Sequence, residues 1–159
     1  MDRKLNALFL FLAVVVFITA ANTAQQWNIL LGVLLAGLFS LAAFAFRGLS
    51  LDGMFSAIVI GTFAFGLGGW KTAAILLLFF ISSVAISDRS KWREEHISKN
   101  VRRDGLQVWA NGFWLVIFLI CATVFKAPIF LVGAIATIAT ATADTWATEL
   151  GSKNPESTY

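Results

Sequence analysis

The chain has 159 residues, of which 58% are hydrophobic and 13% are charged, and its formal net charge is +3. A water-soluble domain of this size has about a quarter charged residues, so the composition excludes an ordinary soluble protein and is typical of an integral membrane protein. The charged residues collect in short segments between long apolar runs. We expect these segments to be loops, with the lipid bilayer, and no nucleic acid, as a partner.

A helix needs roughly 20 predominantly apolar residues to cross the hydrocarbon core, and the chain has six candidates. In chain order they are residues 5–24, 27–46, 53–68, 71–87, 106–125 and 127–148. Only the stretch GLGGWK separates the third from the fourth, and it favours a tight turn over a break inside one re-entrant segment. The sequence therefore predicts an all-α fold, a polytopic membrane bundle of about six transmembrane helices.

The first segment also resembles a secretory signal peptide, because Arg3 and Lys4 precede the apolar run and the small residues AANTA follow it. Its uncharged length exceeds the roughly 7–15 residues of a signal core, and the second apolar segment follows after only two glutamines. We therefore expect a retained first helix. The loop 88–105 is the sharpest internal boundary, and residues 1–159 are expected to form a single membrane domain.

Lysine and arginine are unevenly distributed, and cytoplasmic loops carry an excess of both. If six helices follow a cytoplasmic N-terminus, ten basic residues fall on the cytoplasmic side, and only Lys71 and Lys126 fall outside. The sequence therefore predicts that both ends of the chain, the loop 88–105 and the end of the last helix are cytoplasmic. We expect the membrane to be the plasma membrane of a prokaryote.

The last apolar segment ends in TATADTWATELGS, residues 140–152, which places Asp144 and Glu149 at its cytoplasmic mouth. At about 100° per residue, these acids and the neighbouring threonines cover roughly half of the helix circumference. The threonines include Thr140, Thr145 and Thr148. So much polarity is expected to line a cavity or a packed polar interface.

Carboxylates near a basic face can hold Mg²⁺, which shares its remaining coordination sites with water and phosphate. The two acids are about 140° apart on a helix, so we expect Asp144 to touch the metal and Glu149 to act through water. The structural alternative is that the threonines satisfy backbone carbonyls, Asp144 pairs with an arginine and Glu149 lies among lipid headgroups.

A second polar pattern, NVRRDGLQVWANG, leads from the long loop into the fifth segment. If it is helical, four residues share one narrow face: Asn100, Asp104, Gln107 and Asn111. The amides could read the edge of a base or sugar, and Arg102 and Arg103 could grip phosphate oxygens. Equally, the amides could join two helices while the arginines reach the interface.

The fourth segment ends with Ser83, Ser87 and Lys91 at a spacing of four residues. Lys91 could meet a phosphate, although an interfacial lysine and serines bonded back to carbonyls are the ordinary interpretation. The following loop contains no glycine-rich phosphate cradle. Any nucleotide site would therefore be unconventional.

The paired serines at 82–83, RRDGLQVWANG and ATADTWATELGS, in this order, resemble the integral-membrane family known as domain of unknown function 92. Its best characterised plant relative is the chloroplast phytyl-phosphate kinase of tocopherol synthesis, and an animal transmembrane protein belongs with it. ADTWATELG is the most specific string; QVWANG is the next, with Trp109 where a leucine is expected. The resemblance covers about the whole chain, but other members continue into a glycine-rich segment and more helices. The chain is therefore expected to be the N-terminal part of such a protein.

The resemblance implies a kinase that converts an isoprenoid monophosphate to the diphosphate, with CTP or another nucleoside triphosphate as donor. Phosphoryl transfer needs Mg²⁺ on carboxylates, cations on the phosphates and an aligned nucleophile. Asp144, Glu149 and Lys91 are the catalytic candidates, and the other polar residues of the three patterns are candidates for binding substrate or nucleotide. The donor, the prenyl chain length and the choice between alcohol and monophosphate acceptors stay open.

The alternative function is a small ion-coupled transporter, or a transporter subunit, with Asp144 as the ion or proton site. Transporters often place polar residues near the bilayer midplane and contain inverted repeats and broken helices. Here the polar residues crowd one face of the membrane, and only the GLGGW break favours transport. A scaffold protein would leave the acidic helix mouth unexplained.

Overall fold

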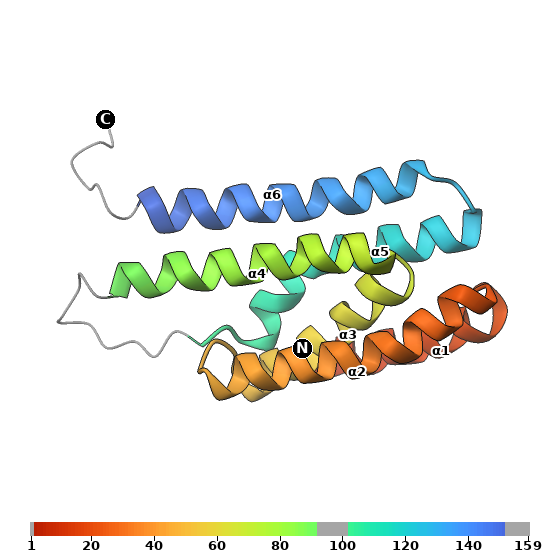
Figure 1. The fold of residues 1–159 in the computed structure, drawn as a ribbon, viewed down its shortest axis with the longest axis horizontal. Helices are drawn as coiled ribbons and strands as arrows, with labels where there is room; N and C mark the ends of the chain where they lie inside the picture. Colours follow the sequence, from red (N-terminus) through yellow and green to blue (C-terminus); the bar gives the residue numbers. More distant parts are fainter. Residues whose placement is uncertain (1, 92–101, 152–159) are drawn as a thin grey trace.

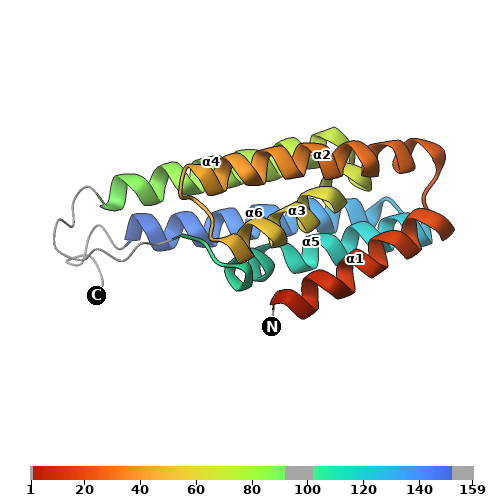
Figure 2. The same ribbon diagram turned by 90° about the horizontal axis from the view of Figure 1, so that it is seen from below.

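The computed structural model describes residues 2–91 and 102–151, which fold into six helices (Figure 1). Successive helices run in opposite directions along the bundle (Figures 1 and 2). The expected all-α bundle is confirmed. Its helices are α1 (Asp2–Thr19), α2 (Thr23–Ala45), α3 (Leu51–Gly66), α4 (Gly69–Lys91), α5 (Gly105–Phe125) and α6 (Ile129–Gly151).

In the part of the chain that the structure describes, four helices are long and apolar enough to cross a membrane: α2, α4 as far as Ile86, α5, and α6 as far as Thr148. Helix α1 starts with charged residues. Helix α3 has 16 residues, about 24 Å at 1.5 Å per residue, which is shorter than the hydrocarbon core of about 30 Å. It nevertheless lies at the centre of the bundle, because it contacts α1, α2, α4 and α5.

The turn between α3 and α4 is short, as predicted. Helix α3 ends at Gly66 and α4 begins at Gly69, whose φ of +74° is readily adopted by glycine. The glycines therefore separate two helices that run in opposite directions, and they do not interrupt a single re-entrant segment.

Side-chain capping moves the boundary between α1 and α2. Oδ1 of Asn22 accepts a hydrogen bond of 2.9 Å from the N–H of Gln25, whose Oε1 accepts one of 3.1 Å from the N–H of Asn22. This capping box starts α2 at Thr23 instead of residue 27, and α1 ends at Thr19 instead of residue 24. The two glutamines expected in the loop therefore lie inside α2.

Helices α4 and α6 continue beyond the predicted spans, to Lys91 and Gly151 instead of residues 87 and 148. An apolar run marks the part of a helix that suits lipid, whereas the helix itself can continue into water. The two helices pack against each other, and their last turns project together beyond the starts of α3 and α5 (Figures 1 and 2).

The core joins the first helix to the centre of the bundle. The ring of Phe9 on α1 lies 4.6 Å from the ring of Trp109 on α5 and meets Phe63 on α3 edge-on at 6.2 Å. All three side chains are buried. Helix α1 is therefore packed as part of the bundle.

Candidate functional site

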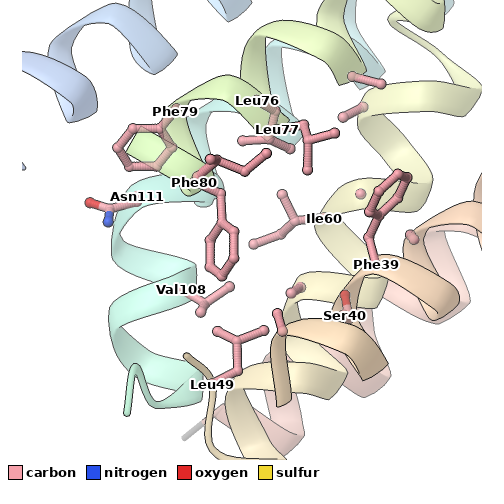
Figure 3. Close-up of a pocket in the computed structure, with 18 of the residues that line it drawn as sticks. Phe39, Ser40, Leu49, Ile60, Leu76, Leu77, Phe79, Phe80, Val108 and Asn111 are labelled. Carbon is pink, nitrogen blue, oxygen red and sulfur yellow. The ribbon is translucent and has the colours of Figure 1, made fainter. Parts of the chain in front are cut away.

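An apolar groove of about 720 Å³ lies between α2 and α4, with α3 as its floor and α5 along one side (Figure 3). Ile60 and Ala64 contribute to the floor. The polar side chains in its lining are Ser40, Trp70, Arg103 and Asn111. The volume is within the range of small-molecule sites, which are mostly apolar with a few placed polar groups. The groove therefore suits a hydrocarbon chain that ends in a polar group.

Arg103 lies at the end of the bundle that the sequence assigns to the cytoplasm, between the end of α2 and the start of α5. Its N–H donates a hydrogen bond of 3.1 Å to the carbonyl of Gly48, and its carbonyl accepts one of 3.0 Å from the N–H of Ser50. These bonds flank a short parallel bridge between Arg103 and Leu49, which is only 1% exposed. The α2–α3 loop therefore fixes the main chain at Arg103.

Aromatic rings lie beside both arginines. The guanidinium carbon of Arg103 is 6.0 Å from the centre of the Phe80 ring on α4, and that of Arg102 is 5.9 Å from the Phe44 ring on α2. These distances are at the outer limit of a cation–π contact. The buried Nε of Arg102 has no hydrogen-bond partner among the described atoms. Of the two guanidinium groups, which are of the kind that binds phosphate oxygens, that of Arg103 belongs to the lining of the groove, and that of Arg102 comes from the neighbouring residue of the chain.

The predicted polar face of the fifth segment is divided between a helix cap and a helix surface. Asp104 is the N-cap of α5, and its Oδ1 accepts a hydrogen bond of 2.8 Å from the N–H of Gln107. The side chain of Gln107 is exposed, and Asn100 lies outside the described residues. Asn111, one turn further on, lines the groove beside Phe79 (Figure 3). Among the described members of this set, Asn111 alone reaches the groove.

The serines of α4 occupy different surroundings. Ser83 is fully buried, and its hydroxyl has no hydrogen-bond partner in the described part of the chain. It follows Phe79, a groove residue, by one helical turn, but it is not itself among the lining residues. Ser87 and Lys91 belong to α4, but their side chains lie outside the described ones. Their contacts with phosphate stay predictions.

The threonines of α6 partly follow the structural alternative. The hydroxyl of Thr140 donates to the carbonyl of Ala136 at 2.9 Å, and that of Thr142 donates to the carbonyl of Ile138 at 2.7 Å. Thr145 is half-buried and Thr148 is exposed. The hydroxyl of Thr140 therefore satisfies the backbone of its own helix.

Asp144, the first of the two acidic residues of α6, is exposed. Asp144 follows the groove residue Ala141 by three positions, and it makes no ion pair with the residues that the structure describes. Within residues 2–91 and 102–151, no group of three histidine, cysteine, aspartate or glutamate side chains is close enough to hold a metal ion. Glu149 is part of α6, but its side chain lies outside the described ones.

The predicted site residues come from elements that meet at one end of the bundle. Helices α4 and α6, which carry Lys91 and Asp144 near their C-terminal ends, project beyond the start of α5 (Figures 1 and 2). Arg103 precedes that start by two residues. Arg103 and Asn111 line the groove, whereas Asp144 is not among its lining residues.

A family model described as "Integral membrane protein DUF92" matches residues 34–159, more than three quarters of the chain. The chain belongs to this family. No match was found among curated proteins or among solved structures. The matched part runs from the middle of α2 to beyond α6 and contains every predicted site residue of this DUF92 protein.

Two features of the DUF92 protein are not predicted by its sequence patterns. The groove is built from ordinary apolar side chains of several helices; the one sequence signal was a row of small residues on one face of α3, Ala57, Gly61 and Ala64. The rings of Phe44 and Phe80 gave no signal, because a cation–π contact depends on how separate helices pack. Both features became visible only in the folded bundle.

Proposed function

We propose that this DUF92 protein is a membrane-embedded kinase that transfers a phosphoryl group from CTP, or another nucleoside triphosphate, to an isoprenoid monophosphate such as phytyl or geranylgeranyl phosphate. The product is the isoprenoid diphosphate. The observation that carries the proposal is an apolar groove with Arg103 at one end and with Asn111 in its lining. The proposed acceptor has a matching shape and polarity, because it is a long apolar chain with an anion at one end.

In the proposed reaction, an oxygen of the acceptor phosphate attacks the γ-phosphorus of the donor. The bond between that phosphorus and the β–γ bridging oxygen breaks, and the nucleoside diphosphate leaves. An acceptor that is already a phosphate needs no strong general base, so catalysis depends on positioning and on neutralising charge. Arg102 and Arg103 would hold the acceptor phosphate, and Asn111 would orient it.

Mg²⁺ is the proposed cofactor, and it would neutralise charge on the transferred phosphoryl group. Mg²⁺ sites often use only one or two carboxylates, because water and substrate phosphates complete the coordination. The described residues contain no group of three potential metal ligands, and Asp144 is proposed to supply one exposed carboxylate at the cytoplasmic end. Asp144 would bind the ion, Glu149 would act through bound water, and Lys91 would contact a donor phosphate.

The remaining predicted residues are proposed to contact the nucleotide or to orient these groups. They are Ser83, Ser87, Asp104, Gln107, Thr140, Thr145 and Thr148. We place the protein in the plasma membrane of a prokaryote, with this end of the bundle facing the cytoplasm, where the donor is available. The distribution of lysine and arginine supports this orientation.

The test is a transfer assay with the purified full-length protein in detergent. Radiolabelled CTP, ATP, GTP or UTP is offered with geranylgeranyl or phytyl monophosphate, or with the corresponding alcohols, and the lipid products are separated. We expect Mg²⁺-dependent label in the diphosphate product. Label in no prenyl lipid would contradict the proposal and favour ion-coupled transport, with Asp144 as the ion site.

A further inference from the structure

The open side of the groove lies between α2 and α4, and its rim is apolar and exposed. Phe39 on α2 and Phe46, the C-cap residue of α2, are 53% and 88% exposed, and Ile81 on α4 is 54% exposed. The floor residues Ile60 and Ala64 are buried. Because α2 and α4 are both long and apolar enough to cross a membrane, we expect this rim to face hydrocarbon and the groove to open sideways toward lipid.

The charge in the lining is confined to one end. Arg103 is the one charged residue among the described lining residues, and the opposite end is bordered by Trp70. From Val84 to Trp70, α4 extends about 21 Å at 1.5 Å per residue, roughly two thirds of a hydrocarbon core of about 30 Å. A single chain with an anionic head at Arg103 would therefore lie along the helices, with its tail in the hydrophobic part of the membrane.

We propose that the groove is the acceptor site and that a single-chain isoprenoid monophosphate enters it sideways from the bilayer, through a portal between α2 and α4. Phe39, Phe46 and Ile81 border this portal. The inference rests on the proposed function for the identity of the acceptor, and it adds where the chain binds and how it arrives. The phosphate would move along the membrane interface to Arg103.

Sideways entry is favoured because transfer of the isoprenoid chain from lipid into water has a high free-energy cost. Each methylene group moved from an apolar phase into water lowers the equilibrium population about fourfold. Passage of some sixteen such groups through water would be disfavoured on the order of a billionfold. Entry between α2 and α4 avoids this, because the chain exchanges contacts with lipid for contacts with an equally apolar groove.

A binding test needs no catalysis. A geranylgeranyl monophosphate analogue with a photoreactive diazirine at its chain end is placed with the protein in phosphatidylcholine nanodiscs, irradiated, and the labelled peptides are mapped. Label should fall on α3 and on the facing sides of α2 and α4, and decline about fivefold or more with excess unlabelled geranylgeranyl monophosphate. Ala74→Phe, which fills the groove, should also lower the labelling about fivefold or more. Leu38→Phe, on the exposed side of α2, should leave the labelling unchanged.

Three outcomes of this experiment would overturn the proposed site. Label spread evenly over all lipid-facing helices would mean that the groove holds no specific lipid. Equal competition by phosphatidic acid would assign the groove to ordinary anionic phospholipids. At higher protein density, cross-links between two copies of the chain could replace the label in the groove peptides. This result would assign the groove to a protein interface.

The route is tested by closing the portal. Phe39→Cys and Ile81→Cys are combined in a Cys121→Ala background and bridged with bismaleimides of increasing length, with bridging confirmed by mass. Bridging should lower turnover of geranylgeranyl monophosphate in nanodiscs about tenfold or more, and should leave turnover of water-soluble dimethylallyl monophosphate within about twofold. Each single-cysteine variant, treated identically, is the control.

The outcomes separate the two proposals. Unchanged turnover of both acceptors after bridging would overturn sideways entry and leave the kinase function intact. Groove labelling without turnover of either acceptor by the unbridged protein would reject the kinase function and support the lipid site. Bridging that stops both acceptors equally would overturn the portal, because the damage would then lie in catalysis and not in entry.

Discussion

The indole N–H of Trp109 donates a hydrogen bond of 2.7 Å to Oδ1 of Asn6 and so joins α5 to α1 across 103 positions of the chain. Trp109 is 1% exposed and packs against the ring of Phe9. A buried indole N–H usually has a hydrogen-bond partner. Asn6 supplies it from a helix that otherwise contributes apolar side chains to the core.

Asn6→Ala should therefore destabilise the bundle, because it leaves the N–H of Trp109 buried without its partner. We expect a loss of about 1–3 kcal/mol in the free energy of unfolding, measured by SDS titration in detergent micelles. Asn28→Ala, on α2, is the matched control and should change stability by less than about 0.5 kcal/mol. Equal stability of the two variants would show that the bond contributes nothing measurable.

Gly53 lies where the start of α3 meets the main chain of Arg103. A Cβ at Gly53 would collide with the carbonyl oxygen of Arg103, whereas a Cβ at Gly37 would meet nothing within 4 Å. Gly53→Ala should cost about 1–3 kcal/mol of stability and raise KM for the acceptor, because Arg103 must move. Gly37→Ala should be neutral or slightly stabilising. Both variants are compared by thermal unfolding and by the KM for the acceptor. Equal values for the two variants would contradict this prediction.

Asp144→Asn keeps the size and polarity of the side chain but removes its charge. If Asp144 binds Mg²⁺, transfer should fall at least about 100-fold, while membrane insertion and binding of the photoreactive lipid stay nearly normal. Asp52→Asn, an exposed acid in the first turn of α3, is the control and should retain activity. Glu149→Gln should be milder than Asp144→Asn. Near-normal Mg²⁺-dependent activity of Asp144→Asn would place the metal elsewhere.

Neither side-chain amide of Gln107 or Asn111 makes a hydrogen bond with the described residues. Their removal should therefore weaken substrate use more than folding. We expect Asn111→Ala to lower kcat/KM for the acceptor about tenfold and Gln107→Ala to act mainly on the donor, with stability changed by less than about 0.5 kcal/mol. Normal turnover by a correctly inserted double variant would assign both amides to helix packing.

The predicted orientation can be tested by labelling cysteines in intact cells, in a Cys121→Ala background. The α1–α2 connection is predicted to lie outside, so a cysteine at Ala21 or Asn22 should react with an impermeant maleimide. A cysteine at Ser90, near the end of α4, should react only after the cells are opened. The reverse pattern would place the site residues on the outer side and leave the donor nucleotide without access.

The number and order of the helices could be read from the lengths of the apolar runs, and the turn before Gly69 from its glycines. Boundaries were less accurate where capping decided them. Asn22 and Gln25 form a capping box, and Asp104 is followed by Gln107 at the same spacing, so both starts carried a readable signal. Helix ends that are set from apolar runs alone miss these signals, because a helix can begin or end in polar residues.

The candidate site was predictable only as a set of polar residues near one membrane face. Its arrangement was not, because the position of Arg103 depends on hydrogen bonds to Gly48 and Ser50, which are more than fifty residues earlier in the chain. The groove likewise depends on the packing of several helices around α3. Local sequence patterns contain no information on such distant contacts.

The shortness of α3 also has a consequence for the membrane around the protein. Its length of about 24 Å is roughly 6 Å less than the hydrocarbon core, so a bilayer of ordinary thickness does not match the centre of this bundle. Hydrophobic mismatch of this kind is relieved by local thinning or tilting. The thickness of the host bilayer thereby becomes a variable for this protein, because thicker membranes would draw the polar starts of α3 and α5 toward hydrocarbon.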